Sequence, residues 1–338
     1  MNASELAKKL SPAAKIVSPR SGIPIAQCLK IEAGRVVGSD WSSWLTVDAP
    51  ELDLPTMCVN ADMLMRALAN AGDGDATIEA SEGSVVVKCG RRRITIPTLP
   101  ADEFPMPATI GEPIIQYRGK ALANAIARSA PMASTNESLF HLCGVSLYGG
   151  CAVAADNASG CEVTVDGLDA PDDGSVILPR HVLPLISGEI DLSCDGRIAE
   201  IAMDGRSLVT RLVDGTFPDY RRVMPTDAQD VASFSATALL ASAKAAVATI
   251  PENGGRLATL RSDGTSVALI GRGGTFEDGI GADVARDFAV GINVAKLAGI
   301  LEALGDVEVQ WSGDDVSKPQ MLVAGNVRCV LMPVRIAL

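Results

Sequence analysis

The thiols and imidazoles of this chain are the side chains whose spacing could support covalent chemistry. His141 and Cys143 lie two residues apart, and on a strand such residues point to the same face, so a thiol-imidazole pair is geometrically conceivable. No neighbouring residue is placed to orient the imidazole. The sequence also contains no Gly-x-Ser-x-Gly motif and no phosphate-binding glycine loop. We therefore expect a protein that is not an enzyme.

The other cysteines show no ligand or disulfide spacing. Eight cysteines occur without any Cys-x-x-Cys pair, and a chain of 338 residues can stabilise itself without disulfides. We interpret them as reduced residues of the core and the strands. His141 and His181 are the two histidines, which leaves a His-based zinc site poorly supported. We therefore expect neither a metal ion nor another cofactor.

The charge balance restricts the partners of the chain. The 41 acidic residues exceed the 29 basic ones and give a formal net charge of −12, which argues against tight nonspecific adhesion to nucleic acid or anionic membrane. A nucleic-acid role would need local basic patches. The first residues do not form a secretory signal, and no apolar run approaches the ~20 residues of a membrane span. We expect a cytoplasmic protein with no membrane partner.

An internal repeat must position these residues. Segment 211–225 runs from a basic strand into an Asp-containing turn and then Phe-Pro, and segment 93–105 is a shorter copy of it. A recurrence at a domain-sized interval indicates a duplicated architecture. A chain of this length is also expected to divide into two or three domains. We therefore predict three domains, at residues 1–112, 113–227 and 228–338.

Each predicted domain has the pattern of a helix, strands, a second helix and hairpins. Apolar residues at three- and four-residue steps predict amphipathic opening helices, at 5–17, 119–130 and 236–248. Second helices are expected at 60–68, 179–186 and 293–301. Asn60 and Asn293 are the expected N-caps, whereas Pro12 and Pro184 predict a kink or an early end. Short runs broken by Gly and Asp predict hairpins, so each domain is expected to be α+β and mainly antiparallel.

These motifs make the chain resemble a known family, the bacterial DNA polymerase III beta subunits or DNA sliding clamps. The resemblance rests on segments 93–105 and 211–225, on the near-terminal run 330–336 and on 153–156, and it covers essentially the whole chain. It implies the DNA clamp fold, with three similar domains that each have two helices and antiparallel sheets. It also implies that two chains pair head to tail as a homodimer and close a ring with helices inside and sheets outside.

The same resemblance implies a function without catalysis. The ring would encircle double-stranded DNA and tether a DNA polymerase and other proteins with clamp-binding motifs, after loading by an ATP-driven clamp loader. By position, Arg20 matches a DNA-contacting arginine of the family, and Phe140 and His141 stand where the family often has two tyrosines. Lys8 and Lys9 would add diffuse positive lining. The alternative is that Phe140 only packs and that His141 is a surface residue.

A second implied surface is an apolar groove between the second and third domains, which accepts short motifs ending in apolar residues. A flexible methionine and several aliphatic residues would make this groove adaptable. The alternative is that the C-terminal run is an edge strand whose side chains face the core. The positions that match the family groove are Leu142, Ala155, Asn157, Gly160, Pro218, Arg222, Val223, Val316, Val330, Leu331, Met332, Pro333, Val334 and Arg335.

The chain departs from the family at one part of this groove. The usual sequence after the aspartate resembles Gly-His-Arg-Leu, whereas residues 157–160 read Asn-Ala-Ser-Gly, which removes a bulky apolar wall and a cation. The departure favours a wider pocket or one adapted to a different partner motif. It also keeps an alternative function open: a clamp-like scaffold of a phage, plasmid or secondary replication or repair system with one dedicated partner.

Overall fold

The chain folds into two compact units. The computed structural model describes residues 2–18, 20–71, 74–226, 228–252, 255–313 and 317–335. Unit 1 comprises Met1–Gly119 with Pro184–Leu212, and unit 2 comprises Lys120–Leu183 with Val213–Leu338. Because the units are defined by contacts and not by repeats, the three domain boundaries of the sequence analysis remain a prediction.

The described strands of unit 1 form one antiparallel sheet in the order β5-β6-β7-β4-β1-β2-β3-β15-β14-β13-β8. Their hairpins include the one predicted from residues 76–88. The bounds are β1 Cys28–Glu32, β2 Arg35–Ser39, β3 Ser43–Asp48, β4 Met57–Asn60, β5 Ala76–Ser81, β6 Ser84–Cys89, β7 Arg92–Leu99, β8 Ile115–Gly119, β13 Ile190–Cys194, β14 Ile198–Met203 and β15 Arg206–Arg211.

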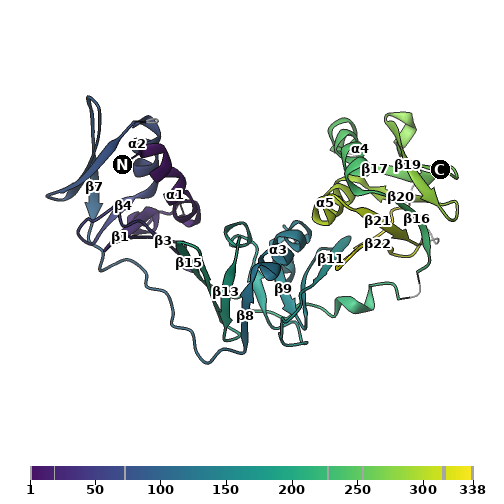
Figure 1. Cartoon of the computed structure of the whole chain (residues 1–338), viewed down its shortest axis with the longest axis horizontal. Helices are drawn as coiled ribbons and strands as arrows, with labels where there is room; N and C mark the ends of the chain where they lie inside the picture. Colours follow the sequence, from purple (N-terminus) through teal and green to yellow (C-terminus); the bar gives the residue numbers. More distant parts are fainter. Residues whose placement is uncertain are drawn as a thin grey trace. The chain divides into compact units, whose positions relative to one another are not determined.

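Helices α1 (Ala3–Ile16) and α2 (Ala61–Ala71) pack against this sheet and against each other (Figure 1). The apolar residues of both helices are buried in one core cluster of unit 1. This confirms the prediction of amphipathic helices from the spacing of apolar residues. Pro12 lies inside α1 without ending it, so of the two expected effects, a kink or an early end, the early end is wrong. Gly38 on β2 allows the helix to approach closely, since a Cβ atom there would lie 2.0 Å from the Ala13 carbonyl oxygen.

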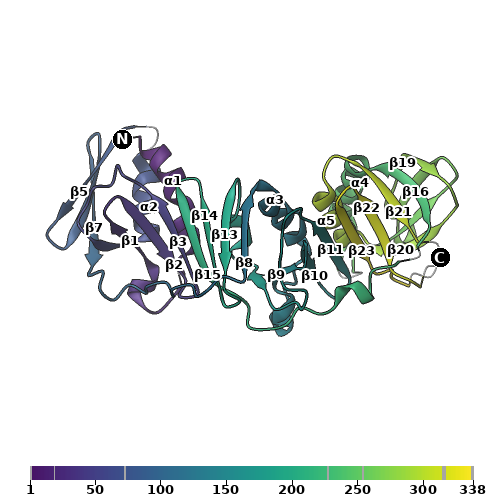
Figure 2. The same cartoon turned by 60° about the horizontal axis from the view of Figure 1, so that its bottom comes forward.

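The described strands of unit 2 form a second antiparallel sheet in the order β12-β9-β10-β11-β23-β22-β21-β16-β19-β18-β17-β20 (Figure 2). Strand β23 pairs with β11 on one side and β22 on the other, so Val330 and Leu331 of the C-terminal run lie on an interior strand and not on an edge. The bounds are β9 Gly144–Tyr148, β10 Cys151–Ala155, β11 Ser159–Thr164, β12 Ile177–Pro179, β16 Asp230–Ser235, β17 Leu257–Ser262, β18 Ser266–Gly271, β19 Glu277–Val284, β20 Ala289–Asn293, β21 Glu308–Ser312, β22 Gln320–Ala324 and β23 Val327–Leu331.

Three α-helices of unit 2 match the prediction: α3 (Lys120–Ser129), α4 (Ala236–Thr249) and α5 (Val294–Leu304). The second helix predicted at 179–186 is wrong, because only the 3-10 turn Leu183–Leu185 forms there. Pro184 has no N–H for a longer helix. The expectation of two helices in every domain is therefore met in the first and third blocks, and the second block has one α-helix among its described residues. Within the described residues, no helix is long and apolar enough to cross a membrane.

A recurring turn shows the internal repeat at atomic level. The pairs β2–β3, β10–β11 and β17–β18 are each joined by an Asp-x-x-Ser turn. The carboxylates of Asp40, Asp156 and Asp263 accept the N–H of the serine three residues later, at 2.7, 2.8 and 3.1 Å. Such a side-chain hydrogen bond stabilises the turn locally. The three strand pairs can therefore be compared residue by residue.

Candidate partner-binding groove and DNA-contacting residues

An apolar pocket opens in unit 2 where the turn between β10 and β11 lies beside the end of β23. Its volume is about 140 Å³. It is lined by small strand residues and by larger side chains from the segment 220–224 and from the end of β23. The lining residues are Val153, Ala154, Ala155, Asp156, Asn157, Ser159, Gly160, Cys161, Tyr220, Val223, Met224, Val330 and Met332.

Six of the groove positions expected from the sequence line this pocket. Val223 and Met332 are 51% and 38% exposed, so apolar side chains face solvent at its rim. Such exposed apolar surface around a concavity is typical of a binding site. The six are Ala155, Asn157, Gly160, Val223, Val330 and Met332.

The other expected positions that the structure describes are not among the residues that line the pocket. Leu142 packs in the same apolar cluster as Val330, and Leu331 is fully buried. The exposed Arg222 pairs with Asp219 at 2.9 Å. Val316 lies outside the described residues. Pro218 and Arg335 are exposed, and Pro333 and Val334 are half-buried beyond β23.

Sequence reasoning missed several lining residues, of which Tyr220 and Met224 are the largest. Both are buried, at 5% and 6% exposure, and both belong to the repeated segment 211–225. Tyr220 packs edge-on against Tyr148, with ring centroids 5.3 Å apart. Burial, followed by the nearby Glu162, raises the pKa of Tyr220, so the phenol stays neutral. Apolar and aromatic residues that follow Phe-Pro were the available signal. The smaller missed residues are Val153, Ala154, Asp156, Ser159 and Cys161.

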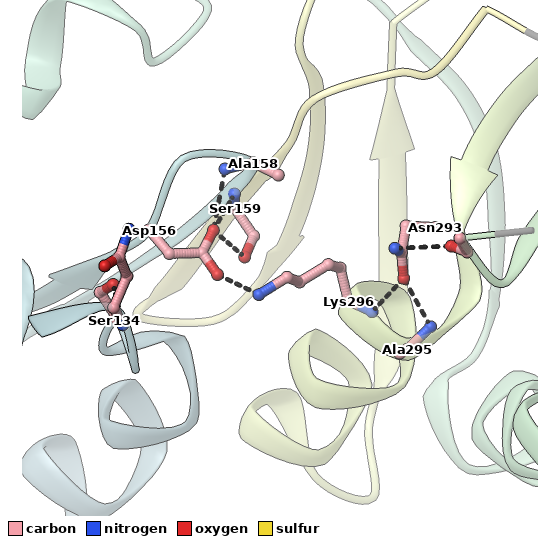
Figure 3. Close-up of polar contacts among 9 residues, drawn as sticks. Ser134, Asp156, Ala158, Ser159, Asn293, Ala295 and Lys296 are labelled. Carbon is pink, nitrogen blue, oxygen red and sulfur yellow. Dashed lines mark hydrogen bonds and ion pairs between the residues drawn. The ribbon is translucent and has the colours of Figure 1, made fainter. Parts of the chain in front are cut away.

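An ion pair ties the turn of the pocket to helix α5. Asp156 accepts the backbone N–H groups of Ala158 and Ser159, each at 2.8 Å, and the ammonium group of Lys296 (Figure 3). Lys296 is positioned by Asn293, which caps α5 by accepting the N–H groups of residues 295 and 296. Burial alone would raise the pKa of Asp156, but the bond from Lys296 and the two backbone bonds lower it below its ordinary value. The ionised carboxylate of Asp156 therefore holds the turn between β10 and β11 in place.

Three of the residues proposed to contact DNA lie in unit 1. Lys8 projects from α1 and Arg20 follows that helix, and both are exposed. Lys9 is half-buried and pairs with Glu51 at 2.9 Å, so its charge is partly neutralised. Lys8 and Arg20 are thus the more available cations of this set.

Phe140 and His141 lie in unit 2, in the 3-10 segment Glu137–Leu142. Their rings meet edge-on with centroids 5.5 Å apart, and Phe140 is 52% exposed. Because this segment is not a strand, the strand alternation that would have paired His141 with Cys143 does not apply. The Cys143 thiol instead donates to backbone carbonyls, such as that of Asn136 at 3.3 Å. All eight cysteines are free, as expected.

The fold and the pocket define a class of protein: a repeated, mainly antiparallel α+β chain with an apolar pocket beside the end of β23. No family model matches the chain. The beta sliding clamp of Caulobacter vibrioides is 24% identical over 298 residues, covering 81% of this chain and 80% of the relative. That of Pseudomonas putida is 25% identical over 368 aligned positions, covering 98% of both chains.

Solved structures agree with these relatives over the whole fold. The DNA polymerase III beta subunit of Thermotoga maritima has a TM-score of 0.82 at 19% identity and covers 100% of this chain and 99% of its own. A Pseudomonas aeruginosa sliding clamp bound to griselimycin has a TM-score of 0.84 at 22% identity and covers 99% and 98%. The chain is thus similar to beta sliding clamps along its length, and it has the fold of the DNA polymerase III beta subunits.

Proposed function

We propose that the protein works as a DNA sliding clamp in the cytoplasm, where a ring of two chains holds duplex DNA and tethers a DNA polymerase. The observation that carries the proposal is the similarity to beta sliding clamps along the full length of both chains. A ring retains DNA topologically, so its contacts with phosphates can stay weak and allow sliding. A net charge of −12 with local cations is compatible with that mode of binding.

Charge distribution supports a head-to-tail homodimer. Arg91 in the turn after β6 and Arg92 and Arg93 at the start of β7 are consecutive and exposed in unit 1. Glu277 and Asp278 are exposed at the start of β19 in unit 2. A heterologous interface joins two different surfaces, and opposite charges favour their correct pairing. We therefore expect these two patches to meet across the dimer, and its affinity to fall as salt increases.

The apolar pocket of unit 2 is the proposed site for partner motifs. Exposed Val223 and Met332 at its rim, with buried Tyr220 and Met224 behind them, offer a concave apolar surface to a short peptide. The replicative polymerase, the clamp loader and other motif-bearing proteins are its proposed ligands. We further propose that Lys8 and Arg20, with Phe140 and His141, contact DNA.

The proposal is tested with a replicative polymerase, a clamp loader and ATP on primed circular DNA. The protein should lengthen the products of the polymerase and synthesise nothing alone. A solution mass near twice 35.0 kDa should accompany that activity. A strict monomer at micromolar concentration, with no effect on product length, would contradict the proposal.

One observation favours a second candidate, a clamp-like scaffold with a single dedicated partner. Residues 157–160 lack the bulky side chain and the cation of the usual groove. A general clamp should bind a generic polymerase-derived clamp-binding peptide at micromolar strength. A dedicated scaffold should ignore that peptide and bind its own partner.

A further inference from the structure

The sheet of unit 2 contains a seam between two groups of strands. Strands β12, β9, β10 and β11 come from residues 144–179, whereas the strands from β23 to β20 in the sheet order come from residues 230–331. In the described part of unit 2, the pairing of β11 with β23 is the single strand pairing that joins the two groups (Figure 2). A bond between β11 and β23 would therefore hold the two groups together.

Two cysteines face each other across this seam. Cys161 of β11 lies directly opposite Cys329 of β23. Three positions further along the same ladder, the backbone N–H of Thr164 donates to the carbonyl oxygen of Asn326 at 3.0 Å. Hydrogen-bonded and non-hydrogen-bonded pairs alternate along an antiparallel ladder, so the two cysteines form a non-hydrogen-bonded pair. The side chains of such a pair lie closer together than those of a hydrogen-bonded pair.

The spacing of a non-hydrogen-bonded pair suits a disulfide. The Cα atoms of such a pair lie about 4.5 Å apart, within the range of about 4.4 to 6.8 Å that disulfides span. Both side chains are buried, at 1% and 0% exposure. A hydrogen bond with Cys161, followed by burial, raises the pKa of the Cys329 thiol well above its ordinary value, so the two thiols are already in contact. A bond between their sulfur atoms need not move the strands.

A second pair of cysteines, in unit 1, lacks this geometry. Cys28 of β1 and Cys58 of β4 are also buried, free and on neighbouring strands. Cys28 lies opposite Asn60, however, and Cys58 lies opposite Lys30, so the two cysteines are diagonal neighbours. The Cα atoms of diagonal neighbours lie about 7 to 8 Å apart, which a disulfide cannot bridge without backbone movement. This pair is therefore a built-in control for the pair at the seam.

We propose that Cys161 and Cys329 are a redox site, at which hydrogen peroxide joins β11 to β23 by a reversible disulfide. The thiolate of one cysteine displaces hydroxide from the peroxide and becomes a sulfenic acid. The thiol of the other cysteine attacks that sulfur and releases water. In sum, the two thiols lose two electrons and two protons, and one peroxide is reduced to two molecules of water. The inference does not depend on the proposed function.

The test follows the thiols of the full-length protein. The three partly exposed cysteines are first blocked with iodoacetamide under native conditions. The folded protein is then treated with hydrogen peroxide for a prolonged time, because buried thiols react slowly. It is denatured, alkylated and mapped by tandem mass spectrometry. The map should show Cys161 linked to Cys329, whereas Cys28 and Cys58 should remain thiols. Dithiothreitol should reverse the link.

The disulfide should also stabilise the protein, because it closes a long loop in the unfolded chain. The melting temperature of the oxidised protein should exceed that of the reduced protein by roughly 5 to 15 °C. Amide hydrogen exchange in β11 and β23 should slow down. Cys329→Ala should abolish both differences between the oxidised and reduced forms. Cys28→Ala, which removes a similarly buried thiol, is the matched control and should keep both differences.

Two results would overturn the inference. One is a folded, peroxide-treated protein in which Cys161 and Cys329 are still thiols. The other is a link between Cys28 and Cys58 in place of the link at the seam. Refolding from urea in a buffer of reduced and oxidised glutathione then identifies the cause of a failure, because every thiol is accessible before the fold forms. A link that forms only on refolding means that peroxide does not reach the pair, and no link means that the geometry is wrong.

Discussion

The same strand arrangement is closed in one unit and open in the other. In unit 1, Trp44 is buried over β2, β3 and β15, and its indole N–H is bonded to a backbone carbonyl. In unit 2, the equivalent Gly160 leaves a pocket of about 140 Å³, rimmed by the exposed Val223 and Met332. A repeated fold can thus fill one copy of a site with its own side chain and leave the other copy open. Trp44 and Gly160 stand at the matching strand position, directly after the Asp-x-x-Ser turn of each unit.

The largest effect is expected from opening the closed site. Trp44→Gly should destabilise the protein by about 3 to 5 kcal/mol, because the indole leaves a cavity and the Pro105 carbonyl loses its donor. Urea denaturation followed by circular dichroism measures this loss. Added indole should recover part of it, since a preformed apolar cavity can bind a ring of matching size.

The matched control for that variant is the neighbouring Trp41, which is 45% exposed and has a φ angle of 75°. A glycine tolerates that backbone conformation, so Trp41→Gly should change the unfolding free energy by less than about 1 kcal/mol. Equal losses for Trp41→Gly and Trp44→Gly would mean that Trp44 does not close a packed site, and the comparison of the two units would fail.

A smaller effect is expected at the rim of the open pocket. Met332→Ala removes apolar contact of about 1 to 3 kcal/mol if a peptide covers the side chain. Peptide affinity should therefore fall by about tenfold or more. The melting temperature should stay nearly unchanged, because Met332 is 38% exposed in the absence of a partner. A lower melting temperature with unchanged affinity would move Met332 from the groove to the core.

The smallest effect concerns the turn beside the pocket. Asp156→Asn keeps an acceptor for the backbone N–H groups of the turn but loses the ion pair with Lys296, whose side chain is 39% exposed and can be solvated. The expected loss in unfolding free energy is about 1 kcal/mol at pH 7.

The pH dependence of that loss follows from the lowered pKa of Asp156. The carboxylate stabilises the fold above the ordinary pKa of 3.8, and this contribution disappears as the pH falls through the lower folded value. Wild type and Asp156→Asn should therefore converge in stability in that acidic range. A difference that stays constant down to acid pH would show that the charge of Asp156 is not what holds the turn.

Local features of the fold could be predicted from the sequence. Asn293 caps α5 as expected, and the helices and hairpins follow from periodicity and turn residues. The helix expected around Pro184 did not form, because the proline also prevents the regular hydrogen bonding of the turn that precedes it. Prediction from local sequence succeeds where a short segment determines its own backbone hydrogen bonds.

The pocket was harder to predict because it depends on contacts between distant segments. Lys296 and Asp156 are 140 residues apart, and the pairing of β11 with β23 brings Gly160 beside Val330. Tyr220 and Met224 were missed since the chain path after Phe217 decides which side chains turn inward. The sequence does carry one signal for the pocket. Aligning the Asp-x-x-Ser turns matches Gly160 with Trp44 as equivalent positions of the repeat.

The most direct test of the account is retention on DNA before and after a single cut. The protein is loaded onto a circular duplex with loader and ATP, and moved to salt that screens phosphate contacts. A sliding clamp should remain on the intact circle and be lost when a nuclease linearises it, because its hold on DNA is topological. Equal retention on circular and linear DNA would contradict the clamp function of this chain.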